Sequence, residues 1–270
     1  MSQTTSPDTL DERFAAWRAA GRCALIPYLT CGFPHPGDTG ALLEALADAG
    51  ADVIELGVPF SDPVADGPTI QRSSQQALAQ GVTLASTLAE LASFRARRDT
   101  AVVLFTYLNP LLRYGPERFV RDASAAGAQG VLVTDLPTGG DPALEELLGD
   151  GPLRLIRLVA PTTGAARAQE IVQGARGFVY YIARTGVTGA SAALRATLEQ
   201  DVEALRRIAP VPVAVGFGIS TPEQAARVAR VADGVVVGSA LIAAIEQGGV
   251  AAAGTLIAAM RAAIDGAAGH

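Results

Sequence analysis

The sequence predicts a (β/α)8 TIM barrel, in which eight parallel strands are each followed by a helix. Short apolar runs alternate with longer amphipathic segments eight times, which is typical of a parallel sheet covered by helices. A length of 270 residues fits α/β barrels that fold as one unit, and no linker or charge block divides the chain. We therefore expect a single domain over residues 1–270. A doubly wound open sheet is the alternative, and the even spacing of the eight units favours closure.

The eight apolar runs have the length and composition of buried parallel strands. The predicted strands are residues 24–29, 52–56, 101–107, 130–134, 153–158, 177–182, 211–215 and 234–237. Between them, apolar residues recur at helical spacing. The clearest of these helical segments are residues 38–49, 84–97, 116–126, 165–173, 198–208 and 222–231.

An extra helix is predicted ahead of the first strand, at residues 10–20. Phe14 and Trp17 are spaced to share one face of it, and Asp8 or Thr9 can cap its first turn. Extended loops follow the second and sixth strands. In this architecture function lies where strands end and loops begin, so these loops are the first candidates for a site.

Composition excludes several classes of function. Apolar residues make up 49% of the chain and charged residues 18%, enough for a sizeable core, and the net charge of −6 offers no footprint for nucleic acid or an anionic membrane. The polar first ten residues lack a signal-peptide core, and charges and glycines interrupt the Ala-rich C-terminal region, so we expect no membrane span. Cys23 and Cys31 have no metal-ligand or disulfide spacing, which favours a cytoplasmic location.

The chain contains no lysine, because all 21 basic residues are arginine. A Schiff-base aldolase, a lysine-anchored pyridoxal phosphate enzyme and a lysine-dependent P-loop nucleotidase are therefore excluded. The two histidines, His35 and His270, cannot form a multi-histidine metal site, so we expect no metal centre. Catalysis is left to carboxylates, hydroxyls, arginines and backbone amides.

The second predicted strand ends on a carboxylate, Glu55, which is unusual because burying a charge is costly. Strand alternation places Val53 and Glu55 on one face and Ile54 and Leu56 on the other. If the second pair packs against helices, Glu55 points into the barrel. A structural ion pair and a proton-transfer role are both open at this point, and an apolar interior would raise the pKa of Glu55.

The Pro-rich loop after this strand carries two more carboxylates. Asp62 precedes Pro63, and we interpret it as a turn former that bonds nearby amides. Asp66 would face Glu55 if the stiff loop folds back over the barrel.

Two glycine clusters follow the seventh and eighth strands. Gly216-Phe217-Gly218 precedes a helix starting near Thr221, and Gly238-Ser239 opens another. Glycines let the backbone approach an anion, and helix N-termini offer free N–H groups. Because these two loops commonly form the phosphate site of such a barrel, the clusters predict phosphate binding.

Three further features are open to two interpretations. The small-residue segment 184–192 is either a lid that closes over substrate or a plain surface loop. Tyr180 and Tyr181 end the sixth strand, and only one of them can face the barrel. Asp135, after the fourth strand, either binds substrate or caps the residues that follow it.

These motifs resemble the tryptophan synthase alpha chain family over essentially the whole chain. The segment from Glu55 to Pro68 (ELGVPFSDPVADGP) is similar to the family signature. Supporting matches are YLTCG from Tyr28, YLNP from Tyr107, DLP from Asp135, RTGVTG from Arg184 and GFGIS from Gly216.

The resemblance implies cleavage of indole-3-glycerol phosphate to indole and glyceraldehyde 3-phosphate, without a cofactor. It implies Glu55 as the proton-transfer group and Asp66 as the contact of the indole N–H. The implied substrate-binding residues are Tyr28, Phe105, Tyr107 and Tyr180. The implied phosphate-binding residues are Gly189, Phe217, Gly218, Gly238 and Ser239. The implied lid residues are Arg184, Thr185, Gly186, Val187 and Thr188.

The resemblance also implies a partner, a tryptophan synthase beta chain that receives indole, in an α2β2 heterotetramer. Two other functions stay open on the sequence. One is another phosphate-binding barrel, such as a sugar-phosphate isomerase. The other is an inactive scaffold that only activates the beta chain.

Overall fold

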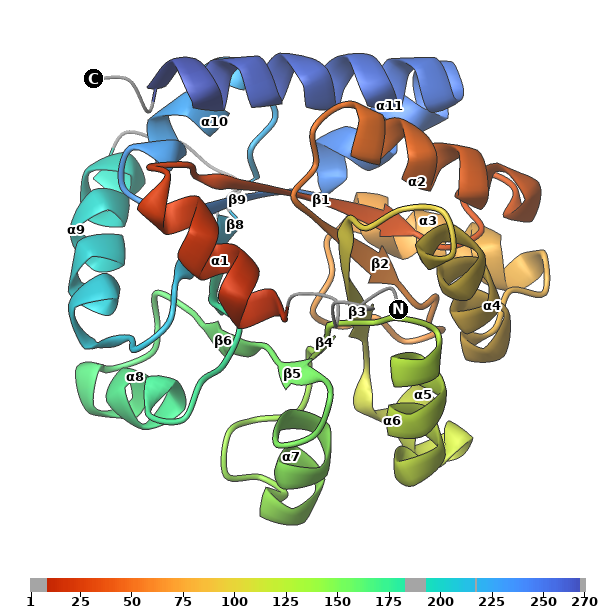
Figure 1. The fold of residues 1–270 in the computed structure, drawn as a ribbon, viewed down its shortest axis with the longest axis horizontal. Helices are drawn as coiled ribbons and strands as arrows, with labels where there is room; N and C mark the ends of the chain where they lie inside the picture. Colours follow the sequence, from red (N-terminus) through yellow and green to blue (C-terminus); the bar gives the residue numbers. More distant parts are fainter. Residues whose placement is uncertain (1–8, 183–192, 217, 268–270) are drawn as a thin grey trace, which may run out of the picture.

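The computed structural model describes residues 9–182, 193–216 and 218–267. Within these ranges nine parallel strands form one sheet in the order β5-β4-β3-β2-β1-β9-β8-β7-β6. Since β5 and β6 are consecutive and separated by Ile156 alone, the row of strands closes on itself, as predicted for a TIM barrel (Figure 1). The strands are β1 (Ala24–Thr30), β2 (Val53–Gly57), β3 (Ala101–Thr106), β4 (Gly130–Val133), β5 (Arg154–Leu155), β6 (Arg157–Val159), β7 (Val179–Ile182), β8 (Val213–Gly216) and β9 (Gly234–Val237).

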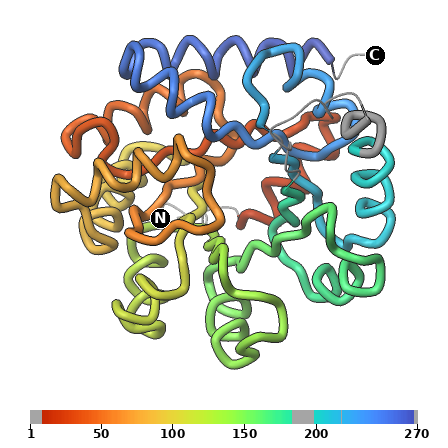
Figure 2. Tube along the Cα trace, turned by 180° about the vertical axis from the view of Figure 1, so that it is seen from behind, coloured from red at the N-terminus to blue at the C-terminus, as the bar shows by residue number. Residues whose placement is uncertain are grey.

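Helices form a ring around the strands, which is visible from both ends (Figures 1 and 2). Within the described ranges they are α1 (Leu10–Ala19), α2 (Thr39–Asp48), α3 (Pro68–Ala79), α4 (Leu84–Arg95), α5 (Leu108–Tyr114), α6 (Pro116–Ala125), α7 (Pro142–Gly149), α8 (Ala165–Val172), α9 (Ala193–Ile208), α10 (Pro222–Ala229) and α11 (Ser239–Ala267), with a short 3-10 turn at Pro36–Asp38.

The structure differs from the sequence-based expectation at the fifth strand. One strand was predicted over residues 153–158, and two short strands are found. β5 pairs with β4, whereas β6 pairs with β7. The change of partner falls at Ile156, whose N–H still donates to the Val131 carbonyl at 2.8 Å. Above this point β4 and β6 have no mutual pairing, so the sheet opens on one side of the barrel.

Three helices are not among the helical segments named from the sequence: α3, α5 and α7. In α3 the buried face includes two serines, Ser73 and Ser74, beside Ile70 and Ala77. Because two of these four buried residues are serines, the helix shows little apolar periodicity, and the sequence pattern does not reveal it. Helices α5 and α7 have seven and eight residues, too few for the period to stand out.

The interior and exterior of the barrel separate along each strand as alternation requires. Val53 packs in the interior cluster, whereas Ile54 and Leu56 pack under the helices. The interior cluster also contains residues of the other strands and of α1: Leu10, Phe14, Ala24, Ile26, Ala101, Val103, Leu132, Ile156, Phe178, Ala214 and Val236.

Helix α1 covers the amino-terminal end of the strands, which we call the barrel base. A capping box of Thr9 and Glu12 starts it, and Leu10 and Phe14 are buried. The Phe14 ring lies 5.0 Å from that of Trp17 and 5.3 Å from that of Phe178 between centroids. The predicted extra helix therefore contributes to the interior core.

Carboxylates fasten the strands at the barrel base. An Asp52 oxygen accepts the Leu25 N–H at 2.8 Å, and Asp233 accepts the Val213 N–H at 2.9 Å. Asp52 also contacts two arginines, Arg22 at 2.9 Å and Arg261 at 3.0 Å. Each carboxylate thus satisfies a strand N–H and is paired with guanidinium groups, the arrangement that makes a buried charge tolerable.

Within the described ranges, α11 is the one helix that is long and apolar enough, by length and composition, to cross a membrane. Gly248 and Gly249 have non-helical dihedral angles and divide it into two helices. Its apolar residues, among them Leu241, Ile257 and Met260, are buried against the barrel.

Candidate active site

Glu55 is the middle residue of β2, so the strand runs two residues past it and does not end on it as expected. We call the region at the carboxyl ends of the strands the barrel mouth. Glu55 is 1% exposed, and its Oε1 has no hydrogen-bond partner among the described residues. Burial raises the pKa of Glu55 to about 8. A structural ion pair was the alternative interpretation of this residue, and within the described part of the chain Glu55 makes no ion pair. A buried carboxyl of this kind is protonated at neutral pH and can exchange a proton with a ligand.

Tyr28 of β1 stands beside Glu55, because the two residues are register partners. Its ring packs edge-on against Phe105 of β3 at 5.1 Å, and its hydroxyl lies over Gly57, where a Cβ would come within 2.3 Å of it. Thr30 donates to that hydroxyl at 3.2 Å, and Thr30 in turn contacts Ser73 at 2.7 Å. The space above Gly57 and the hydrogen bonds through Thr30 together fix the Tyr28 ring at the mouth.

Asp66 is half-buried in the loop between β2 and α3, and desolvation raises its pKa to about 6. The Tyr107 hydroxyl bonds the Asp66 carboxylate and also accepts the Ala65 N–H at 3.1 Å. Both Glu55 and Asp66 raise the pKa of Tyr28 and of Tyr180 after burial, the largest cause. The loop therefore folds back so that the two carboxyl groups act on the same pair of tyrosines.

The two tyrosines of β7 point to opposite sides. Tyr180 packs against the interior cluster, and its hydroxyl lies over Gly216, where a Cβ would come within 2.2 Å. Tyr181 is buried among the outer residues and donates to Asp201 of α9 at 3.1 Å. Tyr180 is thus the one that faces the barrel mouth.

The glycine clusters lie at the ends of neighbouring strands, since Gly216 and Val236 are register partners. Gly218 has a φ of 52°, a conformation that favours glycine. A Cβ on Gly238 would lie 3.8 Å from that of Tyr28, and Ser239 begins α11. Three candidates for phosphate contact are therefore on one side of the mouth. Of the remaining candidates, Gly189, Phe217 and the lid residues Arg184, Thr185, Gly186, Val187 and Thr188 lie outside the described residues.

Two acidic residues have contacts that the sequence did not indicate. Asp135 accepts the Leu108 N–H at 2.7 Å, so it caps α5 and not the residues after it. Asp62 is exposed, and its side chain accepts the Ser61 hydroxyl at 2.5 Å. Tyr107, expected to line a pocket, is also the anchor of the Asp66 loop. Contacts between strand ends depend on register, which residue types alone do not give.

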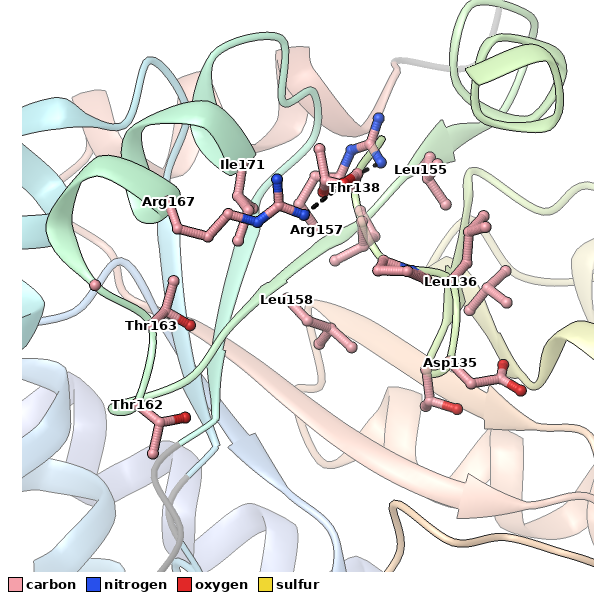
Figure 3. A pocket seen from close by; sticks show the side chains of 15 residues that line it. Asp135, Leu136, Thr138, Leu155, Arg157, Leu158, Thr162, Thr163, Arg167 and Ile171 are labelled. Atoms are coloured by element: carbon pink, nitrogen blue, oxygen red, sulfur yellow. Dashed lines mark hydrogen bonds between the residues drawn. The ribbon is translucent and has the colours of Figure 1, made fainter. Parts of the chain in front are cut away.

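A cavity of about 510 Å³ opens beside the mouth, between the loop after β4 and the loop after β6. It lies where β4 and β6 part, and Leu158 forms part of its wall (Figure 3). Arg167 donates to the Thr138 carbonyl at 2.5 Å, and Arg157 pairs with Glu145 at 2.6 Å. Across the described ranges, no group of three His, Cys, Asp or Glu residues is placed to hold a metal ion.

Comparison with known proteins identifies the family. The model of the family "Tryptophan synthase alpha chain" matches residues 14–264. The tryptophan synthase alpha chain of Rhizorhabdus wittichii is 48% identical over 260 residues, covering 93% of this chain and 96% of the relative. That of Gluconacetobacter diazotrophicus is 51% identical over 235 residues, covering 87% and 86%.

Solved structures agree with this assignment. Tryptophan synthase subunit alpha from Legionella pneumophila is 39% identical with a TM-score of 0.87, covering 95% of this chain and 98% of that one. A chain of Mycobacterium tuberculosis tryptophan synthase is 37% identical with a TM-score of 0.88, covering 96% and 99%. The chain therefore belongs to the tryptophan synthase alpha chain family and is a lyase component of tryptophan biosynthesis.

Proposed function

We propose that the barrel mouth cleaves indole-3-glycerol phosphate into indole and glyceraldehyde 3-phosphate. The observation that carries this proposal is Glu55, a buried carboxyl in β2 whose Oε1 has no partner among the described residues. Leaving a polar group in that state costs stability, and a role in proton transfer accounts for it.

The reaction breaks the bond between indole C3 and the carbinol carbon of the side chain. Indole C3 must gain a proton, and the carbinol hydroxyl must lose one as its carbon becomes the aldehyde. The electron pair of the broken bond returns to the ring, so no oxidant or reductant is needed. General acid–base catalysis by this chain's own side chains suffices for such a step.

Glu55 is assigned both proton transfers. With a pKa of about 8 it is a neutral acid at pH 7 and donates to indole C3. The carboxylate that results then accepts the hydroxyl proton and returns to its starting state. One residue thus moves the proton from oxygen to carbon, and the cycle closes without a net change in the protein.

Asp66 is assigned to the indole N–H. Protonation at C3 makes the ring nitrogen cationic, and a carboxylate facing its N–H stabilises that charge. With a pKa of about 6, Asp66 is ionised at pH 7 while Glu55 is not. Tyr28, Phe105 and Tyr180 are assigned to the walls of the indole pocket.

The phosphate is assigned to the glycine side of the mouth. Gly218, Gly238 and Ser239 offer backbone N–H groups near the start of α10 (Pro222–Ala229) and of α11. Phe217 and Gly189 complete this assignment, and the segment from Arg184 to Thr188 is assigned as the lid, both on the resemblance alone.

The partner is assigned as a tryptophan synthase beta chain in an α2β2 assembly. Two large apolar side chains are exposed on elements at the mouth, Val64 at 78% and Leu112 at 50%. The elements that carry them are joined by the bond between Ala65 and Tyr107. Docking there would give indole a path that avoids solvent and would order the Asp62 loop and the lid. The free, buried thiols of Cys23 and Cys31 support a cytoplasmic location.

The test is indole release from indole-3-glycerol phosphate by the wild type, Glu55→Gln and Asp66→Asn, each with and without beta chain. We expect both variants to lose activity. A wild-type rate in Glu55→Gln would contradict the assigned mechanism. An inactive wild type that still stimulates the beta chain would favour a scaffold, and turnover of another sugar phosphate would favour an isomerase.

A further inference from the structure

Tyr107 connects three parts of the barrel mouth. Its ring is buried and packs against Phe60 of the loop after β2, with 5.0 Å between centroids. Its hydroxyl accepts the Ala65 N–H, bonds the Asp66 carboxylate and is bonded by the Thr134 hydroxyl. The position of this one hydroxyl therefore determines where the Asp66 loop lies.

The backbone of Tyr107 precedes a helix that it cannot cap itself. Tyr107 is the N-cap residue of α5, and no side-chain cap bond is formed by it. The first N–H of the helix, that of Leu108, instead donates to Asp135 at 2.7 Å. Asp135 belongs to the loop after β4, 27 positions further along the chain. A carboxylate from the neighbouring strand end thus satisfies the helix start next to Tyr107.

We propose that Asp135 is a positioning residue for the lyase reaction, acting on Asp66 through the start of α5 and the Tyr107 hydroxyl. This inference rests on the proposed function, because it takes Asp66 to be the contact of the indole N–H. It assigns Asp135 no contact with substrate.

The surroundings of Asp135 separate this role from the neighbouring cavity. In Figure 3 Asp135 lies at the opposite end of the cavity from Arg157 and Arg167. Those arginines are bonded to Glu145 and to the Thr138 carbonyl. The Asp135 carboxylate is bonded to the α5 backbone, so its removal acts first on α5.

The expected signature is a change in the pH dependence of the rate. The groups that act with Asp66 at the mouth are Tyr107, Tyr28, Tyr180 and Glu55. The bond from Tyr107 lowers the pKa of Asp66 and so opposes desolvation, the larger cause, which raises it. Loosening Tyr107 therefore raises the pKa of Asp66, and the fall of kcat/KM on the acid side moves to higher pH.

The experiment compares Asp135→Ala, Asp135→Asn, Tyr107→Phe and the double variant Asp135→Ala/Tyr107→Phe, in the full chain with beta chain. Asp135→Ala should lower kcat/KM on the order of tenfold. It should also move the acid limb, which is the fall of kcat/KM on the acid side of the pH profile, to higher pH. Asp135→Asn keeps an acceptor oxygen for the Leu108 N–H and should restore both. The double variant should be no worse than Tyr107→Phe, because the two changes remove one connection.

Asp141→Ala is the matched control. Asp141 caps α7 by accepting the Leu144 N–H at 3.1 Å, as Asp135 accepts the first N–H of α5. The variant Asp141→Ala should lose stability as Asp135→Ala does, but the acid limb of its pH profile should stay at the wild-type pH. A shift in this control as well, or additive effects in the double variant, would overturn the proposal.

Failure of this inference is distinguishable from failure of the proposed function. If Asp66→Asn abolishes the acid limb while Asp135→Ala leaves kcat/KM and the limb unchanged, only the role of Asp135 is wrong. If Asp66→Asn keeps both rate and limb, the role of Asp66 itself is wrong, and the role of Asp135 falls with it.

Discussion

Two buried carboxyl groups lie three positions apart, Asp52 just before β2 and Glu55 in the middle of it, and their surroundings are opposite. Asp52, just before the strand, accepts a strand N–H and contacts Arg22 and Arg261. Glu55, three positions later, has one oxygen with no partner among the described residues. The first group fastens the barrel base, and the second is left available at the mouth. Both groups are buried, so their hydrogen-bond and ion-pair partners are what distinguish them.

The sharpest test of this contrast is Glu55→Gln. Loss of the proton-transfer group should lower the rate of indole release by about 10²–10⁴-fold. The free energy of unfolding at pH 7 should not fall, because a costly ionisable group is removed. Enzyme assays and denaturant unfolding measure the two effects. The matched control is Glu145→Gln: Glu145 is buried and paired with Arg157, so that variant should lose stability and keep its rate.

Removing a partner of Asp52 at the barrel base should lower the stability of the protein and leave its rate unchanged. Arg261 is 7% exposed and contacts Asp52, Asp265 and the Cys23 carbonyl. Arg261→Met removes one partner of a buried ion pair and should lower the free energy of unfolding by about 3 kcal/mol. The rate of the folded protein should stay at the wild-type value. An unchanged denaturation midpoint would show that the base network contributes little.

The pH dependence of stability should isolate Glu55. Its pKa is raised from 4.5 to about 8 in the folded protein, so the folded state holds a proton that the unfolded state has lost. Stability relative to Glu55→Gln should therefore fall as pH rises from about 4.5 to about 8, by at most about 1.4 kcal/mol per pH unit. Unfolding of both proteins across this range measures the difference. A constant difference would mean that Glu55 finds a partner when ionised.

The smallest expected effect is that of Arg22→Ala. Arg22 also contacts Asp52, but a third of its side chain is exposed, at 33%, against 9% for Arg261. Solvent weakens such a pair, so we expect a loss of about 0.5–1 kcal/mol. A loss equal to that of Arg261→Met would contradict the view that burial sets the strength of these contacts.

Sequence patterns predicted the closed barrel and the inward side of Glu55 because both depend on local periodicity. Val53 and Glu55 alternate with Ile54 and Leu56, and the structure keeps that alternation. The split of the fifth strand at Ile156 was not predictable, since it depends on which neighbours the strand meets. The cap that Asp135 gives to α5 was missed for the same reason. Contacts between separate strand ends come from register, and no window of sequence contains them.

Within the site, predictability followed the same division. Alternation left Tyr180 and Tyr181 open, and packing against Gly216 decides which ring enters the barrel. Asp66 required the loop to fold back, and the anchor that holds it there, Tyr107, lies 41 residues further along the chain.

Helix α1 covers one end of the barrel with Leu10 and Phe14, as described above. One end of the barrel is therefore closed by a helix. On the proposed function, substrate and product would be exchanged with the surroundings at the other end, which holds Glu55 and Asp66. A product released there would emerge beside the exposed apolar side chains of Val64 and Leu112. Because α1 closes the barrel base, molecules could enter and leave only at the barrel mouth.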